Sequence, residues 1–125
     1  MKRDLIEYLE TWKDNSERKP LLLKGARQVG KSYLAKEMGK KFENFVEINF
    51  EFKPGLNTLF KRDLDPKRIV RDLSIVTGED IVPGKTLLFL DEIQECPEAV
   101  NSLRYFHEKM PGLHVIAAQT GIKIS

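Results

Sequence analysis

Gly25-Ala26-Arg27-Gln28-Val29-Gly30-Lys31-Ser32 is the stretch that decides the fold, because it matches Gly-x-x-x-x-Gly-Lys-Ser/Thr at every fixed position. A short apolar run, Leu21–Leu23, comes directly before it and predicts a strand buried on both faces. From Lys31 onward the apolar residues recur at helical spacing. A strand, a glycine-containing loop and a helix in this order indicate a phosphate-binding P-loop.

The residue types of this loop suit the chemistry of a triphosphate. Gly25 and Gly30 let the backbone approach the ligand closely, so that N–H groups can point at phosphate oxygens. Lys31 supplies an ammonium for the β- and γ-phosphates, and the hydroxyl of Ser32 is suited to Mg²⁺. The helix that begins here directs the positive end of its dipole at the phosphates. We therefore expect ATP with Mg²⁺, and the predicted cofactor-binding residues are Gly25, Ala26, Arg27, Gln28, Val29, Gly30, Lys31, Ser32 and Tyr33.

An acidic pair follows a second apolar run. Leu87–Leu90 leads directly into Asp91 and Glu92, the Walker B pattern. Because α/β sheets bind ligands at the carboxyl ends of their strands, we expect both acids to lie beside the loop. Asp91 is predicted to hold the magnesium together with Ser32. Glu92 is predicted to act as general base on the attacking water, and Lys31 is the second predicted catalytic residue.

Strands and helices alternate along the chain. Apolar runs bounded by turn residues predict four strands, at 21–24, 45–50, 86–91 and 113–118. Helical spacing predicts helices over 4–13, 31–42, 54–61, 66–76 and 97–110. This alternation indicates an α/β fold with a mainly parallel sheet.

Composition and charge narrow the class of protein. The 125 residues, 41% hydrophobic and 32% charged, suit one soluble globular domain. A net charge of +2 gives no support to a nucleic-acid partner. The amino terminus does not have the pattern of a signal peptide, and no apolar run approaches bilayer length, so we expect a cytoplasmic protein with no membrane partner. The single cysteine, Cys96, allows no internal disulfide, and we expect it and both histidines, His107 and His114, to be structural.

The P-loop and the Walker B pattern together give the chain a family resemblance. Leu21–Ser32, Leu88–Gln94 and the Ile-Asn-Phe-Glu stretch at Ile48–Glu51 resemble the prokaryotic AAA-type ATPases that carry a C-terminal domain of unknown function. The resemblance covers nearly the whole chain. It implies a P-loop NTPase of the additional-strand, catalytic-glutamate type, with helices on both faces of the sheet. It also implies ATP bound at Gly25–Ser32, magnesium on Asp91 and catalysis by Glu92.

The resemblance also bears on the extent of the domain. That group continues past the strand that follows Walker B, so we expect residues 1–125 to be a P-loop ATPase domain that is incomplete at its C-terminus. Residues 1–18 are expected to form an N-terminal helix leading into the core. Arginine fingers and a second sensor normally lie beyond the position of Ser125. We therefore expect slow hydrolysis by these residues alone, and self-association or a protein partner through the missing region.

Three alternatives remain open at this point. The first concerns the residue that senses the γ-phosphate. The group usually has a Gly-Ser-containing stretch where this chain has Ala117–Gly121, so the sensor is Gln119, Thr120 or neither of them. A second possibility is a module that binds nucleotide without turnover. A third is a P-loop kinase, which requires basic residues to form a lid over an acceptor, although a solvated helix face is the simpler interpretation of these residues. The candidates for such a lid are Lys61, Arg62, Lys67, Arg68 and Arg71.

Overall fold

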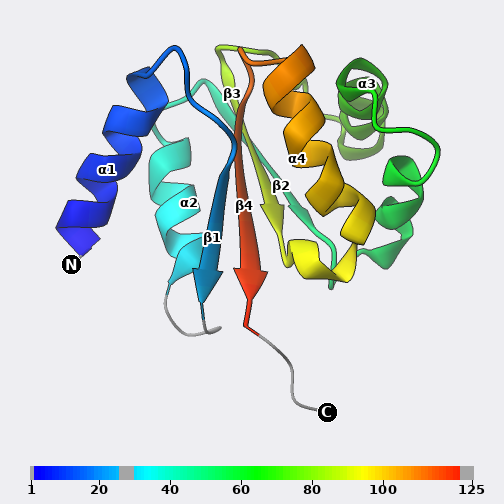
Figure 1. The fold of residues 1–125 in the computed structure, drawn as a ribbon, viewed down its shortest axis with the longest axis horizontal. Helices are drawn as coiled ribbons and strands as arrows, with labels where there is room; N and C mark the ends of the chain where they lie inside the picture. Colours follow the sequence, from blue (N-terminus) through cyan, green and yellow to red (C-terminus); the bar gives the residue numbers. More distant parts are fainter. Residues whose placement is uncertain (1, 26–29, 122–125) are drawn as a thin grey trace.

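Four parallel strands form one sheet in the order β1-β4-β3-β2 (Figure 1). The computed structural model describes residues 2–25 and 30–121. The strands are β1 Leu21–Gly25, β2 Asn44–Asn49, β3 Thr86–Asp91 and β4 His114–Thr120. Since all four run in one direction, their carboxyl ends meet at one edge of the sheet, the lower edge in Figure 1.

Helices cover both faces of the sheet, as predicted. α1 Lys2–Asp14 and α2 Lys31–Gly39 pack on one face, and α3 Pro66–Thr77 and α4 Pro97–Lys109 on the other (Figure 1). Two short 3₁₀ segments, η2 Pro54–Phe60 and η3 Ile93–Glu95, lie on the second side. None of the helices in the described part of the chain combines the length and the apolar character that crossing a bilayer requires.

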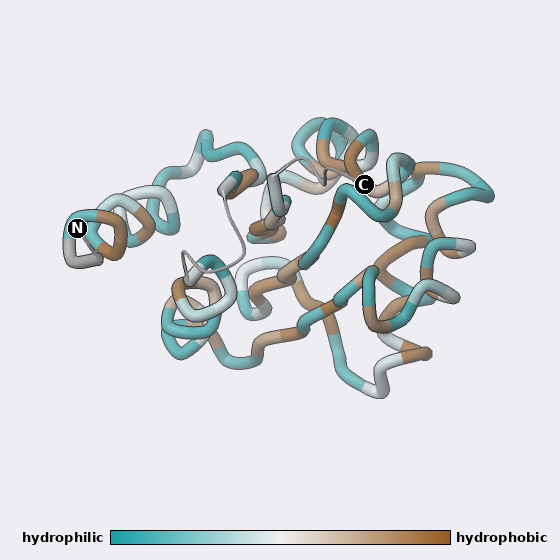
Figure 2. The backbone as a smooth tube through the Cα atoms, turned by 90° about the horizontal axis from the view of Figure 1, so that it is seen from below, coloured by the Kyte–Doolittle hydropathy of each residue, from teal (hydrophilic) through white to brown (hydrophobic). Residues whose placement is uncertain are grey.

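The alternation of side chains along β3 divides the core into two halves. Every residue of β3 is buried. Leu88 and Leu90 pack with the side chains of α3 and α4, whereas Leu87 and Phe89 pack with those of α1 and α2. A strand that is apolar on both faces is what a sheet covered by two layers of helices requires. Figure 2, viewed from the lower side of Figure 1, shows these hydrophobic segments in the middle of the molecule, with hydrophilic turns around them.

His114 joins α1 to the sheet. Its Nε2–H donates to the carbonyl of Lys13 over 2.9 Å, and its Nδ1 accepts a hydrogen bond from Arg18 Nη2 over 3.2 Å. The ring also meets Trp12 and Phe42 edge-on. Burial lowers the pKa of His114, and the neighbouring Arg18 and Lys13 charges lower it further, outweighing the bond to the Lys13 carbonyl. These contacts identify His114 as a neutral structural residue.

Two predicted helices differ from the structure. The helix predicted over 31–42 ends at Gly39, a residue type with low helix propensity. Glycine fits this position because a Cβ there would lie 2.6 Å from the Phe45 ring. Phe42 therefore follows the helix, although it still packs on that side of the core. The segment predicted as a helix over 54–61 is the 3₁₀ helix η2, which starts with Pro54 and Gly55. The remaining elements agree with their predictions to within one or two residues.

Cys96 is fully buried immediately before α4, as expected of a structural residue. Burial raises the pKa of its thiol, and the bond from the Ala99 backbone opposes this shift only in part. A raised pKa disfavours the thiolate, which is the reactive form. Nothing in this environment favours a nucleophilic role for Cys96.

Candidate functional site

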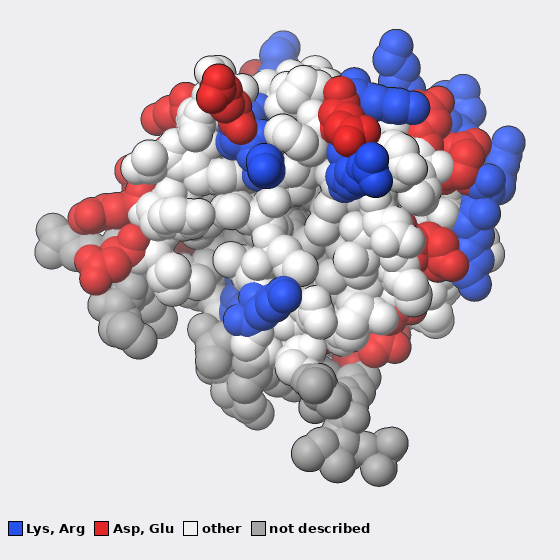
Figure 3. Space-filling model, viewed as in Figure 1, with Lys and Arg blue, Asp and Glu red and all other residues white. Residues whose placement is uncertain are grey.

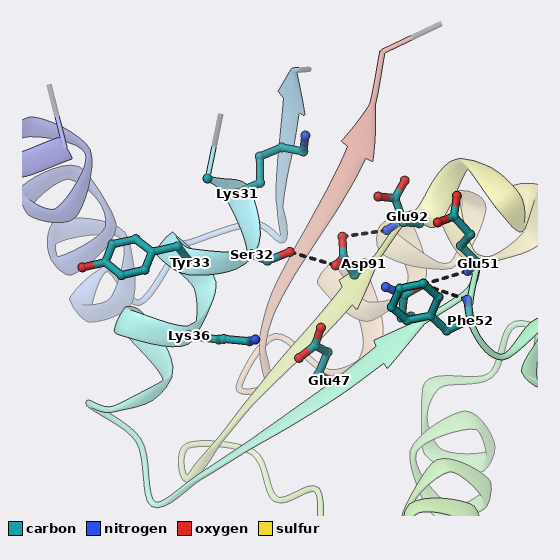
Figure 4. Close-up of a pocket in the computed structure, with 11 residues that line it drawn as sticks. Lys31, Ser32, Tyr33, Lys36, Glu47, Glu51, Phe52, Asp91 and Glu92 are labelled. Carbon is teal, nitrogen blue, oxygen red and sulfur yellow. Dashed lines mark hydrogen bonds between the residues drawn. The ribbon is translucent and has the colours of Figure 1, made fainter. Parts of the chain in front are cut away.

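A cavity of about 290 Å³ opens at the carboxyl edge of the sheet, between α2 and the ends of β2 and β3 (Figure 4). Its walls combine the start of α2, the acidic pair and the segment that follows β2. The residues that line it are Gly30, Lys31, Ser32, Tyr33, Lys36, Glu47, Asn49, Glu51, Phe52, Asp91 and Glu92.

Gly30 sets the direction in which α2 leaves the loop. It caps the helix in the left-handed conformation, with φ 77° and ψ 27°, and its carbonyl accepts the first helical bond from Leu34. Among the described residues, no atom lies within 4 Å of a Cβ built at this position. Glycine is therefore required here for the backbone conformation and not for space. The result is a helix whose first turn begins at the cavity.

Ser32 and Asp91 meet directly in the cavity. The hydroxyl of Ser32 donates to Asp91 Oδ2 over 2.9 Å, and the other carboxylate oxygen accepts from the backbone N–H of Glu92 over 2.9 Å. Asp91 is only 6% exposed. Both of its oxygens are thus oriented by donors from two different elements.

Lys31 lies beside Ser32 in the first turn of α2. Its ammonium donates to the carbonyl of Gly25 over 3.0 Å, across the loop from its own backbone. Its side chain is buried at 7% exposure, which is uncommon for a lysine. This arrangement places a positive charge at the entrance of the loop.

Glu92 turns its backbone sharply at the end of β3. It is the one non-glycine residue with positive φ in the described part of the chain, at φ 52° and ψ 47°. Its Oε1 accepts from the hydroxyl of Thr120 over 2.6 Å and from Gln94 Nε2 over 2.8 Å. Strained backbone is concentrated at functional sites, and here it directs a buried carboxylate toward the end of β4.

The outer wall of the cavity comes from residues outside the two Walker motifs, of which Asn49 and Glu51 belong to the Ile48–Glu51 stretch. Lys36 and Glu47 face one another in Figure 4, and Glu51 and Phe52 follow the end of β2. Burial raises the pKa of Glu47, with Lys36 opposing that shift and Asp91 adding to it. The pairing of β2 with β3 brings this wall to the cavity, because Asn49 at the end of β2 lies opposite Asp91 at the end of β3.

The predicted cofactor-binding residues are only partly described. Gly25, Gly30, Lys31 and Ser32 lie together at the edge of the sheet, whereas Ala26, Arg27, Gln28 and Val29 lie outside the described residues. Tyr33 lines the cavity, but its ring points away from the other labelled side chains in Figure 4. A role for Tyr33 would therefore fall to its backbone.

The predicted magnesium ligands form a suitable donor set. A hydroxyl and a carboxylate are the hard oxygen ligands that Mg²⁺ prefers, and the ion usually takes one or two protein ligands together with phosphate oxygens and water. Ser32 Oγ and Asp91 Oδ2 already lie 2.9 Å apart. Across residues 2–25 and 30–121, no group of three or more His, Cys, Asp and Glu side chains forms a metal site of its own.

Arg68, one of the basic residues considered for a lid, is held in a network of hydrogen bonds. Arg68 is buried and donates to Asp63 and Asp72 over 2.9 Å each, and also to two backbone carbonyls. In Figure 1, α3 lies on the β2 side of the sheet, whereas the phosphate loop follows β1 on the other side. On the face shown in Figure 3, basic and acidic side chains are interspersed. Arg68 is therefore a structural residue and does not contribute to such a lid.

Comparison with known proteins identifies the family. The sequence profile of the AAA domain matches residues 17–122. The chain belongs to the AAA domain family. This membership supports a nucleotide-binding ATPase module.

Solved structures support the same fold. The AAA domain superposes on the structure of C. elegans PCH-2 with a TM-score of 0.59 and 14% sequence identity. The match covers 99% of this chain and 38% of the PCH-2 chain, so the AAA domain spans little more than a third of that protein. No curated protein matches the chain. The parallel α/β architecture with helices on both faces is thus that of an AAA P-loop NTPase.

Proposed function

We propose that this AAA domain binds Mg²⁺–ATP at a Walker A loop, Gly25–Ser32, and hydrolyses it with the Walker B pair Asp91 and Glu92. The observation that carries the proposal is the 2.9 Å hydrogen bond from the Ser32 hydroxyl to Asp91, made at the carboxyl edge of the sheet. It joins the two boxes of sequence at the point where an α/β sheet binds its ligand.

Each residue has a role that follows from its place. The N–H groups at the start of α2 and the ammonium of Lys31 bind the phosphates. Ser32 and Asp91 hold the magnesium, which neutralises charge on the phosphate oxygens when bound. Glu92 accepts a proton from the attacking water, and its 8% exposure keeps its carboxylate largely away from bulk solvent.

The finer assignment extends this proposal. The boxes at Leu21–Ser32 and Leu88–Gln94 favour the AAA group that carries a C-terminal domain of unknown function. We place residues 1–125 in an ATPase domain of that group, in the cytoplasm. An arginine supplied by a second subunit or a partner accelerates phosphoryl transfer by about 10³–10⁵-fold in related chemistry. Slow turnover by these residues alone is the expected consequence.

Calorimetry and phosphate release test the proposal together. ATP is titrated into the wild-type chain with and without Mg²⁺, and phosphate release is then followed for wild type, Glu92→Gln and Lys31→Met. We expect Glu92→Gln to bind ATP normally and to lose about 100-fold in turnover, and Lys31→Met to lose binding. Lys24→Met, at an exposed position one residue before the loop, is the control and should bind as wild type does.

The outcomes separate the alternatives. Absence of ATP binding by the wild-type chain refutes the proposal. Binding without any turnover supports a nucleotide-binding module. Equal turnover in wild type and Glu92→Gln removes Glu92 from the mechanism.

A further inference from the structure

Gln94 makes two hydrogen bonds whose directions are fixed by chemistry. Its Nε2 donates to Glu92 Oε1 over 2.8 Å, and its Oε1 accepts from the backbone N–H of Thr120 over 3.3 Å. A carboxylate can only accept and a backbone N–H can only donate, so the amide has one satisfactory orientation. Gln94 therefore connects the acidic pair after β3 to the end of β4.

A second donor reinforces the contact with Glu92. The hydroxyl of Thr120 donates to the same oxygen, Oε1, over 2.6 Å. Glu92, Gln94 and Thr120 thus form a closed triangle in which each residue contacts the other two. A free glutamate side chain samples many rotamers, and two donors on one oxygen restrict it to few.

The triangle is also joined to the phosphate loop. Directly after Thr120, the N–H of Gly121 donates to the Gly25 carbonyl over 3.0 Å. The same carbonyl also accepts a hydrogen bond from the ammonium of Lys31. The end of β4 therefore lies between Glu92 and the loop, in contact with both.

We propose that Gln94 is a positioning residue that fixes the orientation of the Glu92 carboxylate relative to the end of β4. The proposal rests on the proposed function, because it refines the same site. Its importance follows from geometry: a displacement of about 1 Å in a catalytic group can reduce the rate by about 10²-fold. No other residue type at position 94 serves both partners equally well. A glutamate would still accept from Thr120 but would repel Glu92, and a leucine would serve neither.

A direct test uses the side-chain amide of Gln94 as its probe. In ¹⁵N-labelled protein without nucleotide, the two amide protons of Gln94 are assigned by their loss in Gln94→Leu. We expect them to be well separated from those of solvent-exposed glutamines and to shift in Glu92→Ala and in Thr120→Val. Resonances at the positions of a free glutamine amide, unchanged by both substitutions, overturn the proposal.

A kinetic test asks whether Gln94 acts through Glu92. Gln94→Leu should lower kcat for ATP by about 10- to 100-fold and change KM by less than about twofold. Gln94→Glu, of nearly the same shape, should be impaired at least as strongly and covers the case in which the leucine variant does not fold. The double variant Gln94→Leu/Glu92→Gln should be no slower than Glu92→Gln alone. Asn101→Ala, at an exposed position on α4, is the control and should retain the wild-type kcat.

The outcomes distinguish this proposal from the proposed function. If Glu92→Gln slows turnover but Gln94→Leu does not, the positioning role is wrong and the proposed function stands. If Gln94→Leu slows turnover by the same factor in the wild-type background and in the Glu92→Gln background, Gln94 has a general structural role. This result would also overturn the positioning role. If Glu92→Gln has no effect, or the chain has no measurable turnover, the catalytic part of the proposed function fails, and the amide resonances decide on their own whether Gln94 holds Glu92.

Discussion

The hydroxyl of Ser32 in the first turn of α2 donates to the carboxylate of Asp91 at the end of β3, 2.9 Å away, although 59 residues separate them in the chain. Neither residue is close to the other until the sheet has formed. Their contact brings a hydroxyl and a carboxylate, both hard oxygen ligands, to one side of the cavity. The dependence of nucleotide binding on magnesium should therefore reside in this pair.

Replacing Ser32 with alanine should abolish most of the gain in ATP affinity that Mg²⁺ provides. The substitution removes one hard ligand and the hydrogen bond that orients Asp91, and a bond to a charged group contributes about 1.5–3 kcal/mol. We expect the Mg²⁺-dependent part of the affinity to fall by about 10- to 100-fold and the Mg²⁺-free affinity to change little. Calorimetric titrations of ATP with Mg²⁺ and with EDTA measure both quantities.

Ser16→Ala is the matched control, since Ser16 is exposed in the loop after α1. It should bind ATP as wild type does under both conditions. An unchanged effect of Mg²⁺ in Ser32→Ala would show that Ser32 is not a ligand.

Removing the guanidinium of Arg68 should destabilise the fold. Arg68→Met leaves Asp72 and the backbone carbonyls of Leu59 and Asp63 without their buried donor. Loss of such a network costs on the order of 3 kcal/mol in the free energy of unfolding. Urea denaturation, followed by circular dichroism, provides the measurement.

Arg71→Met is the comparison for this prediction. Arg71 lies on the same helix, but its side chain is 67% exposed, and its Nε is 3.6 Å from Asp72. A pair this exposed contributes less than about 1 kcal/mol. Equal losses in the two variants would contradict the assignment of Arg68 to the buried network.

The stability of the domain should fall as the pH drops below the ordinary pKa of histidine, about 6.5. The pKa of His114 is lowered in the folded state, mainly by burial, so near and below pH 6.5 the unfolded chain binds more protons than the folded one. Protonation of Nδ1 would also replace the lone pair that accepts from Arg18. Free energies of unfolding measured between pH 5 and 7.5 should show this loss.

His114→Gln should flatten that pH dependence, because its amide can still donate to the Lys13 carbonyl but does not titrate. Parallel curves for wild type and His114→Gln would assign the acid sensitivity to other groups.

Adding one methyl group at Gly39 should destabilise the junction between α2 and β2. A Cβ there would lie 2.6 Å from the Phe45 ring, which stacks on Phe89 in the core. Overpacking of this kind typically costs about 1–3 kcal/mol. Gly39→Ala should therefore lower the melting temperature by several degrees, as measured by differential scanning calorimetry.

Gly55→Ala is the control for Gly39→Ala. Position 55 is exposed, and no atom lies within 4 Å of a Cβ built there. This variant should be neutral or slightly stabilised. Equal losses of stability in the two glycine variants would contradict the assignment of the effect at position 39 to the Phe45 contact.

The parts of the fold that sequence analysis predicted are those governed by local patterns. The apolar run Leu87–Leu90 predicts a buried strand, and all of β3 is buried. The prediction that Leu21–Leu23 is buried on both faces is wrong, because β1 stands at the end of the described sheet and its residues are at most partly buried. Asp65 and Pro66 predict the start of α3, where Asp65 accepts from the Lys67 backbone. The end of α2 was missed because Phe42 continues the helical spacing of apolar residues past Gly39, although it packs on the core from outside the helix.

The same distinction holds for the candidate site. Ser32, Asp91 and Glu92 stand in recognisable motifs, and the structure brings them to one cavity. The contact between Gln94 and Thr120 has no motif, since it depends on how the segment after β3 meets the end of β4. Residues of the outer wall, such as Lys36 and Glu47, likewise come together only through packing of α2 beside β2.

The order of the strands has a consequence for synthesis of the protein. In the described sheet β1, which leads into the phosphate loop, pairs with β4, the last of these four strands in the chain, and makes no ladder with β2 or β3. Closing so large a loop delays that pairing until the residues of β4 have been synthesised. On the ribosome, the nascent chain should thus acquire affinity for nucleotide abruptly and late, after β4 has left the exit tunnel.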